Sequence, residues 1–227
     1  MLRGIALMKK NRPQPIGYLN EQRRTFRMGN LIKSTLTIVG LSAVLSGCVL
    51  APQTIELNET VEVPKANAEV QRGALIRVVD NRESIIAGDE TRDYLGSRGG
   101  RLSERSPLLA QDELANILSL RLQDSIAQLG FGGTSPIDPV RVEMLINKFA
   151  YSCNDGFLVT SCSVKMRLGV TLMNGDTTFT KPYGLTETRR VAAAPVKEYN
   201  EKWVNDVMDR LWEYIFSDPE LRGYLGV

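Results

Sequence analysis

Histidine is absent from the 227 residues, and the chain has only three cysteines, two tryptophans and 7% aromatic residues. Without histidine, a His-based catalytic triad, a histidine metal site and a histidine proton shuttle are excluded. The sequence also lacks a GxSxG nucleophile elbow, a P-loop and a Rossmann glycine motif. What is present, 43% hydrophobic and 24% charged residues, is ordinary for a globular protein of this length and excludes whole-chain disorder.

The formal net charge of +2 averages two unlike segments. Eight of the 28 basic residues but only one of the 26 acidic residues precede Cys48, so 20 basic and 25 acidic residues follow it. A nucleic-acid-binding protein needs surplus Lys and Arg to displace counterions from phosphates, and the body of this chain has the opposite balance. We therefore expect no nucleic-acid partner.

The segment before Cys48 has the organisation of an export signal. Basic residues end at Lys33, and residues 34–47 are uncharged and end in small residues. This stretch is shorter than the roughly 20 apolar residues that span a bilayer. Its end, Leu45-Ser46-Gly47-Cys48, resembles the bacterial lipobox, which implies cleavage before Cys48 and acylation of that residue. The alternative is an ordinary signal peptide with an incidental cysteine.

The residue after the cysteine is Val49 and not an aspartate. By resemblance to lipoprotein sorting in Gram-negative bacteria, this implies that the protein is located at the periplasmic face of the outer membrane. Met28 begins a signal of conventional length, so residues 1–27 are predicted to be an untranslated or dispensable extension and residues 28–47 the signal peptide. Translation from Met1 remains open. Twin-arginine export, for which Arg23-Arg24 would be the motif, is the alternative to the general secretory route.

Two regions are predicted after the signal. Residues 48–71 are polar, contain Pro52 and Pro64 and predict a lipidated tether with a short strand within residues 54–63. Residues 72–227 are predicted to form a single periplasmic domain.

Hydrophobic periodicity predicts an α+β domain. The i, i+3, i+4, i+7 spacing predicts one helix over residues 114–131, ended by Gly130, and another over residues 203–216, with a short helix after Asp218. Alternation or β-branched content predicts strands at residues 74–80, 140–146, 164–172 and 177–191, the last interrupted near Pro182, with a loop over residues 81–106. This β-α-β-β-β-α order predicts a largely antiparallel sheet with two long helices packed on one face.

Cys153 and Cys162 flank eight residues between two predicted strands. In an oxidising compartment this pair predicts a structural disulfide. A zinc site is the competing interpretation, but two cysteines without histidine do not complete a zinc tetrahedron. The disulfide would hold a loop in which Phe157 and Leu158 are candidate contacts for a protein partner.

A second candidate binding site is glycine-rich. Glycines expose backbone N–H groups and arginines suit phosphate or carboxylate, so Arg98, Gly99, Gly100 and Arg101 are a candidate anion site. A plain turn bordered by solvated arginines is the favoured interpretation. Asp89, Glu90 and Asp93 are candidate carboxylates for glycoside hydrolysis, but they lie in a polar loop, where a solvated charge cluster is more common. Trp203 and Trp212 are predicted to pack in the core.

Several short motifs together resemble the YajG-type lipoproteins of Gram-negative bacteria. They are the lipobox, residues 54–57 (Thr-Ile-Glu-Leu), 78–82 (Val-Val-Asp-Asn-Arg) and 95–100 (Leu-Gly-Ser-Arg-Gly-Gly), and the helix that ends in Leu129-Gly130-Phe131. The resemblance covers most of the exported region but brings no activity and no catalytic residue. The Cys153/Cys162 pair is not part of the family pattern.

These observations predict a non-enzymatic protein with no metal and no cofactor. The first hypothesis is a binding or assembly module anchored to the membrane by its N-terminal lipid and contacting an envelope protein or cell-wall glycan. The second is a lipid or small-ligand carrier, such as an auxiliary lipoprotein of a transport system, which needs a pocket for an acyl chain between helices and sheet. A hydrolase is third.

Overall fold

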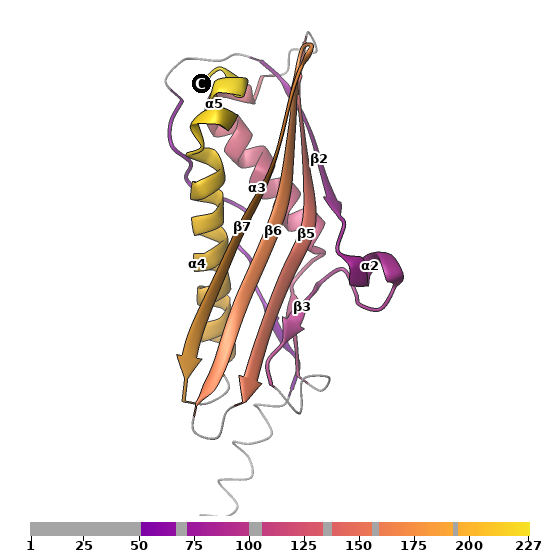
Figure 1. The fold of residues 1–227 in the computed structure, drawn as a ribbon, viewed down its shortest axis with the longest axis vertical. Coiled ribbons are helices and arrows are strands. Elements are labelled where there is room, and N and C mark those ends of the chain that lie inside the picture. Colours follow the sequence, from indigo (N-terminus) through magenta and orange to yellow (C-terminus); the bar gives the residue numbers. More distant parts are fainter. Residues whose placement is uncertain (1–50, 67–71, 100–105, 134–137, 156–158, 193–194) are drawn as a thin grey trace, which may run out of the picture. The chain divides into compact units, whose positions relative to one another are not determined.

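The computed structural model describes residues 51–66, 72–99, 106–133, 138–155, 159–192 and 195–227, all within the second of two compact units, residues 43–227 (Figure 1). The described strands are β1 (Gln53–Ile55), β2 (Ala74–Asp80), β3 (Tyr94–Ser97), β4 (Pro107–Ala110), β5 (Val140–Asp155), β6 (Thr160–Asn174) and β7 (Thr177–Val191). The described helices are α2 (Glu83–Ala87), α3 (Leu114–Ile126), α4 (Lys197–Phe216) and α5 (Pro219–Leu225), and a π-helical turn, η2 (Ala127–Phe131), continues α3.

The long antiparallel strands β5, β6 and β7 form the centre of the structure. Along β6 the side chains alternate, so that Val164 and Met166 are buried while Lys165 and Arg167 are exposed. Helix α4 contacts β6 and β7, and α3 contacts β2 (Figure 1). The core therefore lies against the buried side of the sheet, and the alternation predicted from the sequence is confirmed for this strand.

The sheet is mixed, with the order β1-β4-β3-β5-β6-β7 and with β2 also paired to β5. Strands β2 and β3 both run parallel to β5, and β1 runs parallel to β4. The α+β class is confirmed, and antiparallel pairing predominates because β5, β6 and β7 make the longest pairings, but the predicted element order and the packing of two long helices on one face are not confirmed. Three of the strands have only three or four residues, which is too short for an alternating pattern to show in the sequence.

The region predicted as a loop, residues 81–106, contains α2 and β3. Strand β7 also runs through Pro182 without interruption. Because β7 is at the edge of the sheet, its proline removes no hydrogen bond that an inner strand would need. No described helix is long and apolar enough to cross a membrane.

Residues 51–66 do not form the free tether that their polar composition predicts. Ile55 and Leu57 are fully buried, and β1 pairs with β4. The backbone N–H of Leu57 donates to Gln111 Oε1 at 2.8 Å, and that of Asn58 donates to Asn205 Oδ1 at 2.8 Å. Side chains far away in the sequence thus satisfy this backbone, which is why local composition did not reveal its packing.

Gly96 lets β3 approach β5 closely. Its φ is 141°, and a Cβ atom at this position would lie 1.9 Å from the carbonyl oxygen of Tyr151. Only glycine fits this conformation and this contact. The close approach brings the residues that follow β3 to the end of the sheet where the predicted disulfide lies.

Candidate functional site

Cys153 of β5 and Cys162 of β6 are joined by the predicted disulfide. They face each other directly in the antiparallel register, with their Cα atoms 4.0 Å apart, and both are buried. The bond therefore links two strands that are already paired. Phe157 and Leu158, the candidate contacts in the intervening loop, lie outside the described residues, so their role stays a prediction.

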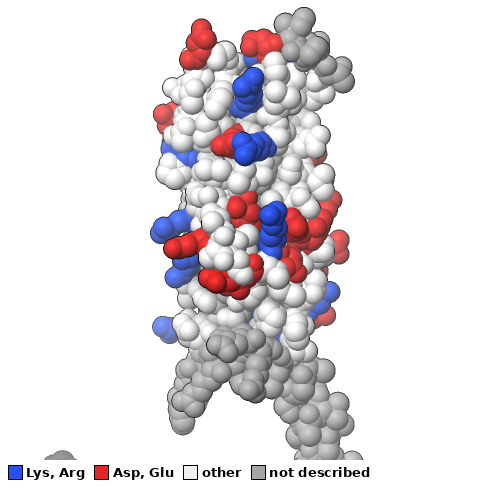
Figure 2. Space-filling model, turned by 90° about the vertical axis from the view of Figure 1, so that its right-hand side faces the viewer, with Lys and Arg blue, Asp and Glu red and all other residues white. Residues whose placement is uncertain are grey.

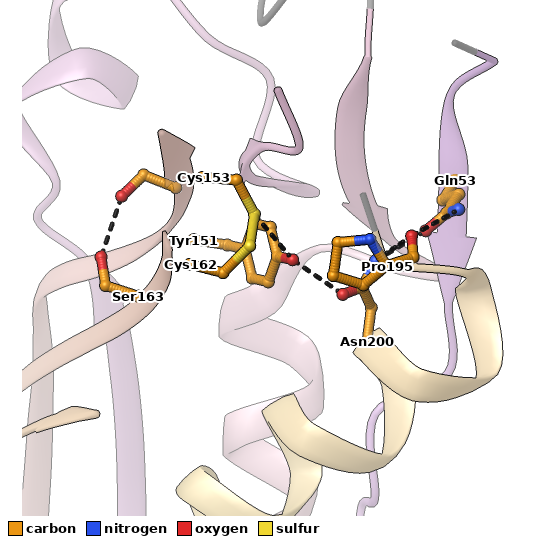
Figure 3. Close-up of a disulfide and its surroundings, with 8 residues drawn as sticks. Gln53, Tyr151, Cys153, Cys162, Ser163, Pro195 and Asn200 are labelled. Carbon is orange, nitrogen blue, oxygen red and sulfur yellow. Dashed lines mark hydrogen bonds between the residues drawn. A yellow bond between two sulfur atoms is a disulfide. The ribbon is translucent and has the colours of Figure 1, made fainter. Parts of the chain in front are cut away.

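A cluster of polar contacts surrounds the disulfide, and we call it the basal cluster: Gln53, Tyr151, Cys153, Cys162 and Asn200 (Figure 3). The Tyr151 hydroxyl donates to Asn200 Oδ1 at 2.8 Å and lies 3.1 Å from Cys153 Sγ. The side-chain amides of Asn200 and Gln53 are hydrogen-bonded at 2.8 Å. The basal cluster thus connects β1, β5, β6 and the beginning of α4.

Burial raises the pKa of the Tyr151 phenol far above its usual range, although the positive charge of Arg98 acts in the opposite direction. Tyr151 therefore remains protonated and remains a donor to Asn200 at any physiological pH. This phenol has a structural role in the contact, because a group that stays neutral does not serve as a general base.

Arg98 is almost fully buried, with 1% of its surface exposed. Its guanidinium donates to the main-chain carbonyl of Ala51, and its backbone N–H donates to Ser106 O at 3.0 Å. Burial lowers the pKa of this guanidinium. Arg98 is therefore neither a solvated arginine of a plain turn nor an open ligand for an anion. Gly99 is partly buried beside it, whereas Gly100 and Arg101 lie outside the described residues.

A second buried arginine, Arg121 of α3, also holds the N-terminal segment. It donates to the carbonyl oxygen of Asn58 at 3.0 Å and to Asp209 Oδ1 of α4 at 2.5 Å. Its guanidinium lies 4.9 Å from the centre of the Trp212 ring. Burial lowers its pKa, and the hydrogen bond to Asp209 opposes that effect. Sequence analysis missed Arg121, although its helical spacing from Ile117 places it on the buried face.

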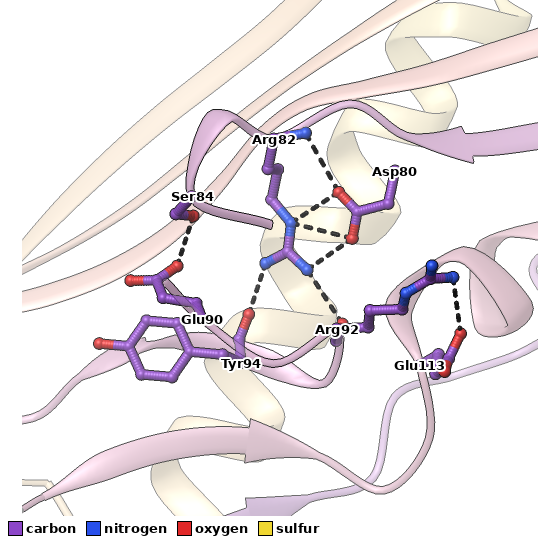
Figure 4. A network of polar contacts seen from close by, with 7 residues as sticks. All are labelled: Asp80, Arg82, Ser84, Glu90, Arg92, Tyr94 and Glu113. Atoms are coloured by element: carbon purple, nitrogen blue, oxygen red, sulfur yellow. Dashed lines mark hydrogen bonds and ion pairs between the residues drawn. The ribbon is translucent and has the colours of Figure 1, made fainter. Parts of the chain in front are cut away.

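The motif at residues 78–82 forms a third polar network (Figure 4). Asp80 and Arg82 make a buried ion pair at 2.7 Å. Arg82 also donates to the carbonyl oxygens of Tyr94 at 2.5 Å and Arg92 at 2.9 Å. Each of the three guanidinium nitrogens of Arg82 donates to a group of the protein, so this arginine fixes the segment between α2 and β3.

A polar surface cavity of about 370 Å³ adjoins this network, where β2 ends and β3 begins along β5. Ser84, Glu90 and Lys148 are among its lining residues, and the Ser84 hydroxyl donates to Glu90 Oε2 at 2.6 Å. Asp89 is exposed, and Asp93 is only partly buried. Among the described residues no group of three or more Cys, Asp or Glu is placed to hold a metal ion.

The two tryptophans pack in the core as predicted. Trp203 and Trp212 have no exposed surface. Trp212 Nε1 donates to Ser125 Oγ of α3 at 2.8 Å, and Trp203 Nε1 donates to Glu187 Oε1 of β7 at 2.9 Å. These indoles therefore join α4 to α3 and to the sheet, and they do not form a ligand platform.

Comparison with known proteins gives a family and two distant structures. A family model described as "Uncharacterized lipoprotein" matches residues 60–226. No curated protein matches the chain. The crystal structure of protein XCC0632 from Xanthomonas campestris, described as a DUF330 protein, is 11% identical, covers 76% of this chain and 98% of its own, and has a TM-score of 0.43. A crystal structure of an uncharacterised protein is 12% identical, covers 71% and 94%, and has a TM-score of 0.38.

The family match spans the segment after β1, the Asp80–Arg82 network, the disulfide and both long helices. It agrees with the resemblance that the short motifs indicated. The chain belongs to this family of uncharacterised lipoproteins, as its resemblance to the YajG-type proteins implied.

Proposed function

We propose that the protein is acylated at Cys48, is anchored to the periplasmic face of the outer membrane and acts as a non-enzymatic binding or assembly module. Membership of a lipoprotein family supports the anchor, and Val49 in place of aspartate supports the outer membrane. In the described part of the chain, no histidine is available and Arg82, Arg98 and Arg121 are hydrogen-bonded within the protein. These features support binding rather than catalysis.

The observation that carries the proposal is the contact between Arg98 and Ala51. Ala51 follows Cys48 by three residues, and three extended residues span only about 10 Å. The proposed acylation site is therefore separated from the described end of the domain by no more than about 10 Å of chain. The domain stands directly at the membrane surface, with β1 next to the lipid, instead of extending from it on a long tether.

A carrier for an acyl chain is less well supported. Trp203 and Trp212 fill the space between α4 and its neighbours with side chains that have no exposed surface. The cavity beside Arg82 is polar and open to the surface, which does not suit a hydrocarbon chain. A bound acyl chain in the purified protein would favour the carrier over the binding module.

Labelling and fractionation of envelopes test the anchor. Wild-type protein should incorporate labelled palmitate and sediment with the outer membrane, whereas Cys48→Ser should remain an unlabelled precursor. Val49→Asp should keep the label and move to the inner membrane, and Val49→Ser is the matched control. The Cys153→Ser/Cys162→Ser variant should label normally. Equal labelling of wild type and Cys48→Ser would refute acylation at Cys48.

A further inference from the structure

The side of the sheet turned away from the core carries charge of one sign. We call this side, formed by the outward residues of β2, β5, β6 and β7, the open sheet face. The strand registers place these outward residues side by side and alternate them with buried ones. Its charged residues are six basic and one acidic: Arg77, Arg141, Glu143, Lys148, Lys165, Arg167 and Arg190.

Most of these basic groups have no counterion among the described residues. Arg77 pairs with Glu143 at 3.3 Å. In the described part of the chain, Arg141, Lys148, Lys165, Arg167 and Arg190 take part in no ion pair or side-chain hydrogen bond, although 24 acidic residues lie elsewhere after Cys48. The excess positive charge of this face is therefore not neutralised by the fold.

The central part of the face brings like charges together. Lys148 of β5 lies directly opposite Arg167 of β6, and Lys165 lies two residues along β6 on the same side. Like charges at directly opposed positions of a sheet are destabilising. Gly184 of β7 stands opposite Arg167, and a Cβ there would lie 3.3 Å from Arg167 Cγ, so the glycine leaves room for the arginine side chain. An anionic ligand would relieve the repulsion.

The rest of the exported chain is acidic. Outside the open sheet face, 14 basic and 24 acidic residues follow Cys48. Figure 2 shows the side that carries α2, where acidic side chains gather, and Glu83, Asp89 and Glu90 belong to this region. Positive charge is thus in excess on the open sheet face and negative charge is in excess elsewhere, which orients an approaching anionic partner toward that face.

The chemistry of the face indicates what kind of anion binds. Threonine hydroxyls surround the cations, including Thr171, Thr180 and Thr186, and the described outward positions carry no aromatic side chain. A surface that inserts into lipid needs a continuous apolar or aromatic face, but here the exposed apolar residues are Leu75 and Met173 at one end. A flat array of basic and hydroxyl groups instead suits carboxylates presented by a protein.

We infer that the open sheet face is the docking surface for an acidic protein of the envelope, whose Asp and Glu side chains pair with Lys148, Lys165 and Arg167. The inference rests on the proposed binding role and specifies its surface and the charge of its partner. It does not require Arg98 or the loop of Phe157 and Leu158.

A binding assay with the full acylated protein in detergent tests the surface. The probe is fluorescently labelled poly-L-glutamate, and anisotropy reports binding. Lys148→Gln/Lys165→Gln/Arg167→Gln should weaken binding about tenfold or more, because three charge contacts are lost. The matched control, with the same change of net charge, substitutes three exposed lysines on other elements by glutamine: Lys65, Lys197 and Lys202. It should change affinity by less than about twofold.

Three results of this assay would overturn the inference. The first is an equal loss of affinity for polyglutamate in the control variant, which would show that binding depends on net charge alone. The second is an unchanged affinity in the open-face variant, and the third is an absence of binding by the wild type. Vesicles containing phosphatidylglycerol are the comparison probe. Binding to these vesicles without binding to polyglutamate would assign the face to a lipid surface instead.

Crosslinking in cells separates this inference from the proposed function. A photoreactive residue replaces Thr186, beside Lys165 in the register, or the exposed Leu120 of α3. The inference predicts a protein adduct from position 186 that the open-face variant loses and the control variant keeps. Adducts only from position 120, insensitive to the open-face variant, would overturn the inference and keep the binding role. Absence of protein adducts from both positions would contradict both.

Discussion

The buried guanidinium of Arg98 donates a hydrogen bond to the main-chain carbonyl of Ala51, three residues after Cys48. This contact, together with the Asn200 and Gln53 amides, makes β1 part of the folded domain. The proposed lipid anchor at Cys48 and the domain are therefore separated by fewer residues than the polar composition suggests.

Arg98→Met should release β1. The substitution removes the donor to Ala51 and leaves that carbonyl without its partner, at a cost of about 1–3 kcal/mol. Amide hydrogen exchange at residues 53–57 should become faster, while exchange in β6 should change little. Arg92→Met, which removes an exposed arginine, is the control. Unchanged protection of residues 53–57 would mean that Arg98 does not hold this strand.

Removal of the disulfide should weaken the domain without unfolding it. Cys153→Ser/Cys162→Ser opens a short loop, and the chain-entropy model gives a loss of about 2–3 kcal/mol in the free energy of unfolding. The pairing of β5 with β6 extends from the disulfide back to Arg141 and Met173, so the circular dichroism spectrum should remain native. Urea denaturation measures the loss, and non-reducing peptide mapping should find the two cysteine peptides joined. Free thiols in the periplasmic protein would contradict this structure.

Gly96→Ala should be strongly destabilising. The new methyl group would collide with the Tyr151 carbonyl oxygen, and φ at this position is positive, so we expect a loss of about 3–4 kcal/mol. Gly88→Ala is a matched control, because Gly88 has a φ of 77° but no atom within 4 Å of the added methyl group. It should cost only about 1 kcal/mol. If denaturation showed that both variants lose the same free energy of unfolding, the contact with Tyr151 would not contribute to the effect of Gly96→Ala.

Acid should remove a stabilising contribution from Asp218. This buried carboxyl caps α5 and accepts a hydrogen bond from the Tyr183 hydroxyl at 2.6 Å. It also forms an ion pair with Lys181 at 2.8 Å. Burial alone would raise its pKa, but the hydrogen bonds from Lys181 and Tyr183 outweigh burial and hold the pKa below its usual value. Because the folded-state pKa is lowered, the contribution is complete above the unfolded pKa of about 4 and is lost as the pH falls further.

The comparison of wild type with Asp218→Asn measures this contribution. Wild type should be the more stable protein at pH 7, and the difference should shrink between about pH 4 and pH 2. Glu220→Gln, at the exposed second partner of Lys181, should show a much smaller difference. A difference between wild type and Asp218→Asn that stays constant over this range would exclude the ionised carboxyl as its cause.

The sequence predicts those elements whose hydrophobic pattern is long enough to see. Strand β2 has the predicted bounds, α3 with η2 covers residues 114–131, and Asp218 and Pro219 begin α5 as expected. The disulfide was predicted from the spacing of its cysteines and from the expected oxidising compartment. The short strands β3 and β4 were missed, and β1 only overlaps the strand predicted within residues 54–63, because contacts with distant residues, rather than their own periodicity, stabilise these strands.

The candidate site was harder to predict for a related reason. Arg98 lies in a sequence that suggests an exposed turn, and only the tertiary structure shows that it binds Ala51. The open sheet face also needs the strand register, because Lys148 and Arg167 are 19 residues apart in the sequence and become neighbours only when β5 pairs with β6. Alternation identifies the outward residues of each strand, but it does not identify the adjacent strand.

The central claim is that the basal end of the domain stands at the membrane, and energy transfer to a dye in the bilayer tests it directly. Donors are placed on the acylated protein in vesicles, at the exposed Val196 before α4 or at Asp176 in the turn between β6 and β7. The 15 residues of β7 separate these ends by about 50 Å. If the basal end stands at the membrane, energy transfer should be efficient from position 196 and weak from position 176. Equal transfer from both positions, or stronger transfer from position 176, would contradict it.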